Sequence, residues 1–145
     1  MTEKLYLSWE DFHKHCRHLA ELIKQSGKSY TRILAVSRGG LLPAGILAYE
    51  LNIRDCEAVN MSSYDEGGRR REDGAVELRA DKSADGQTLI IDDISDSGRT
   101  FKLLRQIYPQ ACFVAVYVKE AGESAVDLFA QKLPDRWLVF PWDVD

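Results

Sequence analysis

Several features by which a protein's function is often assigned are missing from this sequence of 145 residues. It contains no Walker A motif and no Gly-x-Gly-x-x-Gly fingerprint, so nucleotide binding of those two kinds is not supported. Its formal net charge is −4, which argues against a protein that binds nucleic acid through bulk positive charge. The sequence has no apolar N-terminal leader and no long apolar run, so neither a secretory signal nor a transmembrane segment is expected.

Cysteine is also scarce. Cys16, Cys56 and Cys112 are odd in number and widely spaced, so neither a disulfide framework nor a cysteine metal site is expected. Free thiols of this kind are typical of a reducing compartment, and a cytoplasmic location is therefore expected. Hydrophobic residues make up 45% and charged residues 29% of the chain, as in ordinary globular proteins. At this length we expect one domain, residues 1–145, with a substantial core.

The sequence does contain a regular alternation of apolar strands and amphipathic helices. Strands are expected at residues 32–36, 56–61, 89–91 and 111–118, and helices at residues 8–25, 41–51 and 101–107. No hairpin turn joins the strands, which predicts an α/β fold: a mostly parallel, twisted sheet with helices on both faces. His13, His15 and His18 lie on the first helix, but no carboxylate or thiol completes a tetrahedral set. We therefore expect a solvated surface there and not a zinc site.

The most informative stretch follows the strand at 89–91 and reads Asp92-Asp93-Ile94-Ser95-Asp96-Ser97-Gly98-Arg99-Thr100. The next helix is expected to be capped by Thr100 or a residue just before it. Ligands bind at the carboxyl ends of parallel strands, and a helix N-terminus attracts phosphate. Two adjacent acids at the end of a buried strand need partners, and sugar hydroxyls or a hard cation such as Mg²⁺ would supply them.

Two other interpretations of this stretch are weaker. Acids and glycine in a turn often serve only as helix caps and Asx-turns, which leaves the pair of acids at the strand end unexplained. A calcium-binding loop fits its early positions at Asp93, Ser95, Ser97 and Gly98. It fails at the twelfth position, where Leu104 stands in place of a bidentate glutamate, and a strand replaces the incoming helix.

A second stretch repeats the plan of strand, polar loop and helix. Ser37-Arg38-Gly39-Gly40 follows the strand at 32–36, and the next helix has a proline near its start. Paired glycines allow the backbone to approach a ligand closely, and Arg38 carries a permanent charge suited to phosphate oxygens. By itself this pattern is weak, because two glycines after a strand are commonly only a turn.

Together the two stretches resemble the type I phosphoribosyltransferases. Residues 90–100 resemble the signature that binds phosphoribosyl pyrophosphate (PRPP), and residues 37–40 resemble the pyrophosphate loop, in or beside which the resemblance implies a non-proline cis peptide. It also implies a Mg²⁺ cofactor, with Asp93 as the metal contact, and catalytic roles for Asp92, Asp93 and Asp96. The implied PRPP-binding residues are Ser37, Arg38, Gly39, Gly40, Asp92, Asp93, Asp96, Ser97, Gly98, Arg99 and Thr100.

Two further segments fit that family. Residues 64–86 are rich in Gly, Asp, Glu and Arg, with Arg69, Arg70 and Arg71 at their centre and a candidate strand at 76–78. Such a stretch is either a disordered surface excursion or an active-site lid, and the resemblance implies a mobile lid that contacts phosphate. Residues 134–145 are expected to form a small C-terminal hood. Its tryptophans are either core residues or a stacking surface for a purine.

Lys119, Trp137 and Leu138 extend the resemblance to the bacterial xanthine-guanine phosphoribosyltransferases. It implies that N9 of a 6-oxopurine (xanthine or guanine, with hypoxanthine also open) displaces pyrophosphate from C1 of PRPP. Asp96 would then manage the proton at purine N7, Lys119 would donate to O6, Trp137 would stack on the ring, and the Leu138 backbone would read the 2-position. Arg99 departs from those relatives, which carry a small residue there.

Two alternatives remain open from sequence: a nucleotide-sensing regulator on the same fold, and a phosphoribosyltransferase for another base. A regulator that controls RNA or DNA should show a basic face, whereas this chain is acidic and keeps Lys119 and Trp137. The expected partners are thus small molecules, PRPP and the purine base, without nucleic acid. The resemblance also implies a homodimer or homotetramer.

Overall fold

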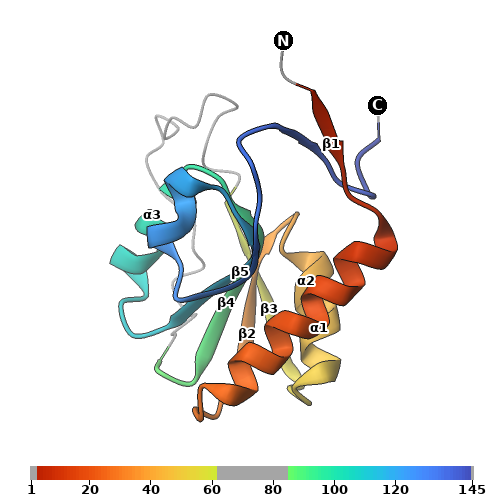
Figure 1. Ribbon diagram of the computed structural model, residues 1–145. Coiled ribbons are helices and arrows are strands. Elements are labelled where there is room, and N and C mark those ends of the chain that lie inside the picture. Colours follow the sequence, from red (N-terminus) through yellow and green to blue (C-terminus); the bar gives the residue numbers. More distant parts are fainter. Residues whose placement is uncertain (1–2, 62–84, 145) are drawn as a thin grey trace.

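The computed structural model describes residues 3–61 and 85–144, and Figure 1 shows them as a twisted sheet between layers of helices. The elements in chain order are β1 (Lys4–Tyr6), α1 (Trp9–Gln25), β2 (Arg32–Ser37), α2 (Leu41–Glu50), β3 (Asp55–Asn60), β4 (Thr88–Ser95), α3 (Arg99–Ile107), β5 (Cys112–Val118), the 3₁₀ helix η1 (Glu120–Ala125), β6 (Leu128–Lys132) and β7 (Trp137–Val139).

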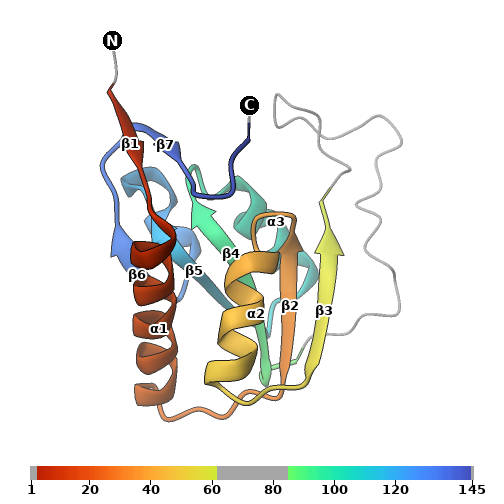
Figure 2. The same cartoon turned by 90° about the vertical axis from the view of Figure 1, so that its right-hand side faces the viewer.

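The central sheet has five strands in the order β3-β2-β4-β5-β6, and every pair in it is parallel. This confirms the expected mostly parallel α/β fold. The strands β1, β6 and β7 were not expected from the sequence. β1 and β7 form a separate parallel pair, which lies beyond the carboxyl ends of the central strands (Figure 2). The N-terminal strand is therefore part of the C-terminal hood.

Helices cover both faces of the sheet, as expected. α1 and α2 lie on one face and α3 on the other (Figure 1). Successive strand residues point to opposite faces, so the apolar runs of β2, β4 and β5 supply both cores at once. Ile33, Leu89 and Val114 belong to the core beneath α1 and α2, and Leu34, Ile90 and Phe113 belong to the core beneath α3. This two-sided burial explains why these segments read as continuous apolar runs.

The two helices that matter for the site begin differently from the first helix. α1 is capped by Ser8, whose hydroxyl accepts a hydrogen bond from the Asp11 backbone N–H at 3.0 Å. α3 begins at Arg99 with Gly98 at its N-cap, in the left-handed conformation (φ 84°), and without a side-chain cap. Of the expected caps, Thr100 is wrong, because it lies inside the helix; the N-cap is Gly98, two residues before it. α2 likewise has Gly40 at its N-cap and no side-chain cap.

Some expectations fall on residues outside the described part of the chain. The lid at 64–86 lies there except for Asp85 and Gly86, as do Arg69, Arg70, Arg71 and the candidate strand at 76–78. Within residues 3–61 and 85–144, no helix is long and apolar enough to cross a membrane. No group of three or more histidine, cysteine or acidic side chains placed to hold a metal ion occurs in those same residues.

The first prediction compares two glycines of the α2 region. A Cβ at Gly40 would lie 2.4 Å from the Ile91 carbonyl oxygen and 2.6 Å from that of Val36, whereas a Cβ at Gly45 would meet nothing within 4 Å. Gly45→Ala should therefore raise the free energy of unfolding by about 0.5–1 kcal/mol, since alanine loses less backbone entropy in a helix. Gly40→Ala should lower it by about 2 kcal/mol or more, because backbone atoms must move. Urea denaturation measures both, and equal effects of the two substitutions would contradict the packing described.

Candidate functional site

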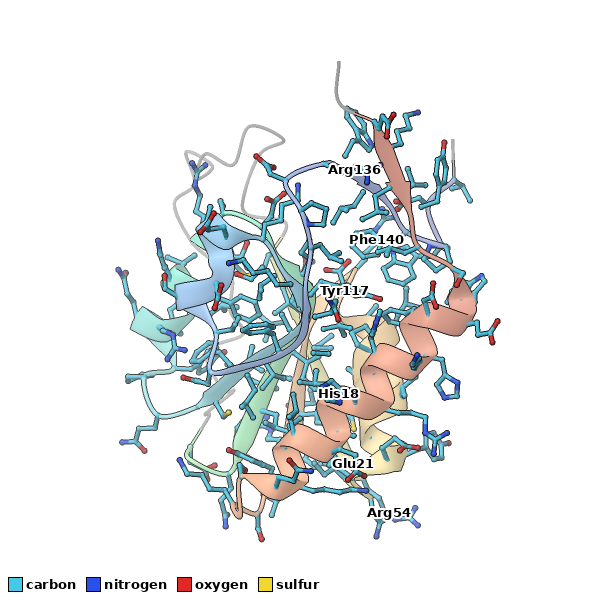
Figure 3. All side chains as sticks on the ribbon, viewed as in Figure 1. His18, Glu21, Arg54, Tyr117, Arg136 and Phe140 are labelled. Carbon is cyan, nitrogen blue, oxygen red and sulfur yellow. The ribbon has the colours of Figure 1, made fainter. Side chains whose placement is uncertain are left out.

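The predicted site residues of the described chain gather at the carboxyl ends of β2, β4 and β5. The loop 37–40 follows β2, the acids and the loop 96–98 come from the end of β4, and Lys119 follows β5. The peptide bond between Ser37 and Arg38 is cis, as the resemblance implied. The hood closes this edge of the sheet from above, and Figure 3 shows Arg136, Phe140 and Tyr117 in succession from the hood toward the sheet.

The two loops meet where Gly39 faces the carboxylate of Asp93. A Cβ at Gly39 would lie 2.6–2.7 Å from the three carboxyl atoms of Asp93, so only glycine fits at this position without displacing the acid. Two backbone N–H groups orient the acids: Asp93 donates to Asp92 Oδ1 at 2.8 Å, and Ile94 donates to Asp93 Oδ1 at 2.8 Å. The pyrophosphate-type loop and the acid pair therefore form one continuous surface.

The electrostatic environment of the acid pair is unfavourable to its charge. Desolvation by burial raises the pKa of Asp92 well above its ordinary value, and the neighbouring charge of Asp93 raises it further. Desolvation also raises the pKa of Asp93, with a smaller contribution from the charge of Asp143. As whole residues, Asp92 and Asp93 are both partly buried. Crowded carboxylate oxygens that disfavour their own negative charge are a donor set that suits a hard divalent cation such as Mg²⁺.

The loop after β4 is built around two close contacts. The Ser95 hydroxyl is buried and donates to the Gly122 carbonyl oxygen at 2.7 Å, which ties the loop to η1. The backbone N–H of Arg99 donates to the Ser97 hydroxyl at 3.3 Å. Because α3 has no side-chain cap, its first turn presents backbone N–H groups and the positive end of the helix dipole to this loop. An anion such as phosphate suits that position.

A cavity of about 460 Å³ adjoins this loop under the hood. Its lining residues are Ile94, Asp96, Lys119, Asp135, Arg136, Trp137, Leu138 and Phe140. Lys119 Nζ lies 3.6 Å from Asp96 Oδ1 and 3.5 Å from Asp135 Oδ1, and the lysine side chain is 12% exposed. The ammonium group therefore sits between an acid of the β4 loop and an acid of the hood.

The structure brings together all four residues predicted to contact the base: Asp96, Lys119, Trp137 and Leu138. Sequence reasoning missed Ile94, Asp135, Arg136 and Phe140. Ile94 could have been predicted, since it lies inside the PRPP-binding signature at residues 90–100. The other three flank Trp137 and Leu138, but nothing in their residue types indicates a cavity.

Aromatic packing fixes the hood to α1. The ring of Trp142 stacks on Phe140, with centroids 4.7 Å apart, and meets Phe12 of α1 edge-to-face at 4.8 Å. The Phe140 ring in turn lies 6.1 Å from that of Tyr117, whose hydroxyl is 2.8 Å from His15 Nδ1. Of the two interpretations of the hood tryptophans, packing therefore applies to Trp142, whereas Trp137 is largely exposed and lines the cavity.

This combination of loops, acids and hood falls within one known family. Residues 4–145 match the model of the phosphoribosyl transferase domain. The chain belongs to this family. The expectation that the protein is a phosphoribosyltransferase enzyme is thereby confirmed.

Individual relatives support the same conclusion. The xanthine-guanine phosphoribosyltransferase of Idiomarina loihiensis is 43% identical over 145 residues, covering 99% of this chain and 89% of that relative. This confirms the predicted resemblance to the xanthine-guanine branch of the family. The purine phosphoribosyltransferase of Pyrococcus horikoshii has the same fold, with a TM-score of 0.77, 22% identity and coverage of 98% and 95% of the two chains. The Xanthine-Guanine-Hypoxanthine Phosphoribosyltransferase of Helicobacter pylori shares it too, at a TM-score of 0.73, 22% identity and the same coverage.

The acid pair generates a prediction about stability and pH. Because the pKa of Asp92 is raised in the folded protein, its carboxyl group holds a proton more tightly there than in the unfolded chain, where an aspartate has a pKa of about 3.9. The carboxylate therefore disfavours folding increasingly as the pH rises from about 4 through the folded-state pKa. Asp92→Asn removes this charge and keeps an oxygen for the Asp93 N–H. Its Tm should exceed that of the wild type by about 3 °C near pH 7, an advantage of about 1 kcal/mol, and by much less near pH 4.

Thermal unfolding from pH 4 to pH 8 measures this difference. Glu21→Gln is the matched control, because the Glu21 side chain is 60% exposed and its removal should give a difference that varies little with pH. An advantage of Asp92→Asn that shrinks as the pH rises would contradict the assignment.

Proposed function

We propose that this protein is a purine salvage enzyme that transfers the 5-phosphoribosyl group of PRPP to N9 of a 6-oxopurine, xanthine or guanine first and hypoxanthine as a further candidate, and releases pyrophosphate. The observation that carries the proposal is the cavity under the hood. In it Asp96 and Lys119, 3.6 Å apart, lie beside Trp137 and Leu138, next to the loop that precedes α3. The 43% identity to a relative named for xanthine and guanine supports the choice of base.

PRPP would lie along the edge formed by the two loops. Its pyrophosphate would meet the loop 37–40, where Arg38 is exposed and the glycines leave the backbone open to close approach. Its ribose hydroxyls would bond to Asp92 and Asp93, and its 5′-phosphate would meet Ser97, Gly98, Arg99 and Thr100 at the uncapped start of α3. Asp93 would hold Mg²⁺, which would neutralise negative charge on the departing pyrophosphate.

The purine would enter the cavity with its 6-oxo edge toward Lys119. An ammonium group only donates hydrogen bonds, so it accepts O6 as a partner and rejects the 6-amino group of adenine. Trp137 would offer an aromatic face for the ring, and the Leu138 backbone would read the 2-position, since both residues line the cavity. Asp96, whose side chain is 65% exposed, would take or hold the proton at N7 as N9 attacks.

We also propose that the protein acts as a homodimer or homotetramer in the cytoplasm. The family resemblance suggests the assembly, which the outer face of α2 supports, and the free thiols suggest the location. α2 is mostly apolar, yet two of its large hydrophobic side chains face solvent: Tyr49 is 91% exposed and Leu41 is 49% exposed. A helix that is apolar nearly all round is usually buried on all sides. Size-exclusion chromatography with light scattering measures the assembly, and a monomer at micromolar concentration would contradict this part of the proposal.

A panel of free bases tests the proposed function. Xanthine, guanine, hypoxanthine, adenine and uracil are each supplied with PRPP and Mg²⁺, and the nucleoside monophosphate is quantified. We expect product from the 6-oxopurines, none from adenine or uracil, and none from any base in excess chelator. Turnover of uracil would favour a phosphoribosyltransferase for another base. Binding of PRPP without any turnover would favour a nucleotide-sensing protein.

The role of Asp96 generates a sharper prediction. Asp96→Asn keeps the shape of the side chain but removes the proton acceptor. Because positioned acid–base groups contribute roughly 10²–10⁴ in rate, kcat/KM for the purine should fall about 100-fold or more. PRPP affinity and Tm should change little. Asp135→Asn is the comparison, since it removes the other carboxylate beside Lys119, and it should lower kcat/KM by much less. Equal losses in the two variants would mean that Asp96 acts only as a partner of the lysine.

A further inference from the structure

The hood is a two-stranded ribbon whose described residues pair with no other strand. β1 and β7 pair only with each other, in the register Lys4 with Trp137, Leu5 with Leu138, and Tyr6 with Val139. An isolated pair of strands is marginally stable in water, so such a ribbon needs side-chain contacts to hold it in place. The residues proposed to stack on the base and read it, Trp137 and Leu138, are two of the three residues of its second strand, β7.

One side chain joins the two strands at the end where the cavity opens. Arg136 donates from Nε to the Glu3 carbonyl oxygen at 3.2 Å and from Nη2 to the Lys4 carbonyl oxygen at 3.1 Å. Its Nη2 also lies 3.5 Å from the carboxylate of Glu3. Arg136 immediately precedes Trp137 and itself lines the cavity, and its side chain is only 33% exposed. Figure 3 shows Arg136 where β1 crosses the hood.

The planar fork of arginine suits this position, because it can donate to two backbone carbonyls at fixed angles while its charge faces a carboxylate. At the other end of the ribbon the Leu7 N–H donates to the Val139 carbonyl oxygen at 2.9 Å, and the aromatic packing of Phe140 and Trp142 follows. The end that carries Trp137 has no comparable aromatic contact among the ring pairs of the described residues. Arg136 is therefore the main side-chain clamp at that end.

From these contacts we infer that Arg136 is a positioning residue for the purine pocket: by binding the backbone of the N-terminal strand, it holds Trp137 and Leu138 at the base. The inference rests on the proposed function, since it concerns the same cavity. The opposite wall of the cavity, formed by Ile94, Asp96 and Lys119, stands on the central sheet and does not depend on the ribbon. Loss of the clamp should therefore alter the distance between the two walls and leave the PRPP loops in place.

The test is Arg136→Ala, measured by steady-state kinetics with guanine and PRPP varied separately. KM for guanine should rise about tenfold, while kcat and KM for PRPP change less than about twofold. The matched control is Arg105→Ala. Arg105 has nearly the same exposure (34%), pairs with Asp127 at 3.0 Å, and donates to the Ala125 carbonyl oxygen at 3.1 Å, so its partners lie at the end of η1 and just after it and not in the hood. Its loss should lower Tm without separating the two KM values.

Two further variants distinguish the clamp from a contact with substrate. Glu3→Gln removes only the ion pair and leaves both carbonyl acceptors, so it should have less than a twofold effect on KM for guanine. Deletion of residues 1–5 removes the acceptors themselves and should reproduce the KM pattern of Arg136→Ala. Arg136→Lys keeps the charge but cannot serve both carbonyls with the same fork, and should give an intermediate rise.

The outcomes separate this inference from the proposed function. If the wild type forms no nucleotide from guanine, the kinetics are measured with xanthine or hypoxanthine instead; if it forms none from any of the three, the proposed function fails, and the inference fails with it. If the wild type is active but Arg136→Ala raises both KM values together, or behaves as Arg105→Ala does, only the positioning role is overturned. A normal KM in the deletion variant would also overturn it. Thermal unfolding and PRPP binding by calorimetry show whether each variant is folded.

Discussion

The structure depends on one crowded contact, between the carboxylate of Asp93 and the backbone of Gly39. β4 is the central strand of the sheet, and its polar end carries two adjacent acids. Desolvation by burial raises the pKa of both, and the charge of Asp93 raises the pKa of Asp92 further. Protein interiors tolerate such groups only when function requires them and other contacts support them. Here two backbone N–H groups hold the carboxylates, and a glycine makes room for one of them. The loop after β2 and the loop after β4 can approach no closer than this contact allows.

That contact also sets the division of the site into two parts. The proposed PRPP part, formed by residues 37–40 and 92–100, stands on β2 and β4, both paired on each side within the sheet. The purine part has one rigid wall on β4 and β5 and one wall on the hood, which the sheet does not support. The proposed base contacts of the hood thus lie on an element that the central sheet does not support, and aromatic packing against α1 and the Arg136 contacts hold that element in place.

Much of the fold and of the PRPP part could be predicted from sequence, because their signals are local. The apolar runs of β2, β4 and β5 indicate strands buried on both faces, and the polar loops that follow them mark the ligand edge of a parallel sheet. The resemblance of residues 90–100 then predicted phosphoribosyl transfer, and membership of the family confirmed that prediction. The helix cap of α3 was predicted at the wrong residue, since a single glycine with positive φ moves the helix start without changing the apolar pattern.

The sequence by itself determined the strand–loop–helix units and the residue types of the site, since each follows from periodicity and side-chain chemistry within about twelve residues. Only the tertiary structure decided which distant segments meet. β1 and β7 lie at opposite ends of the chain, and Arg136 bonds to the carbonyl of Glu3, 133 residues away. These contacts use backbone carbonyl groups as acceptors, which every residue carries, so the residue types at those positions do not predict them. The clamp over the purine pocket therefore exists only once the two ends of the chain are brought together.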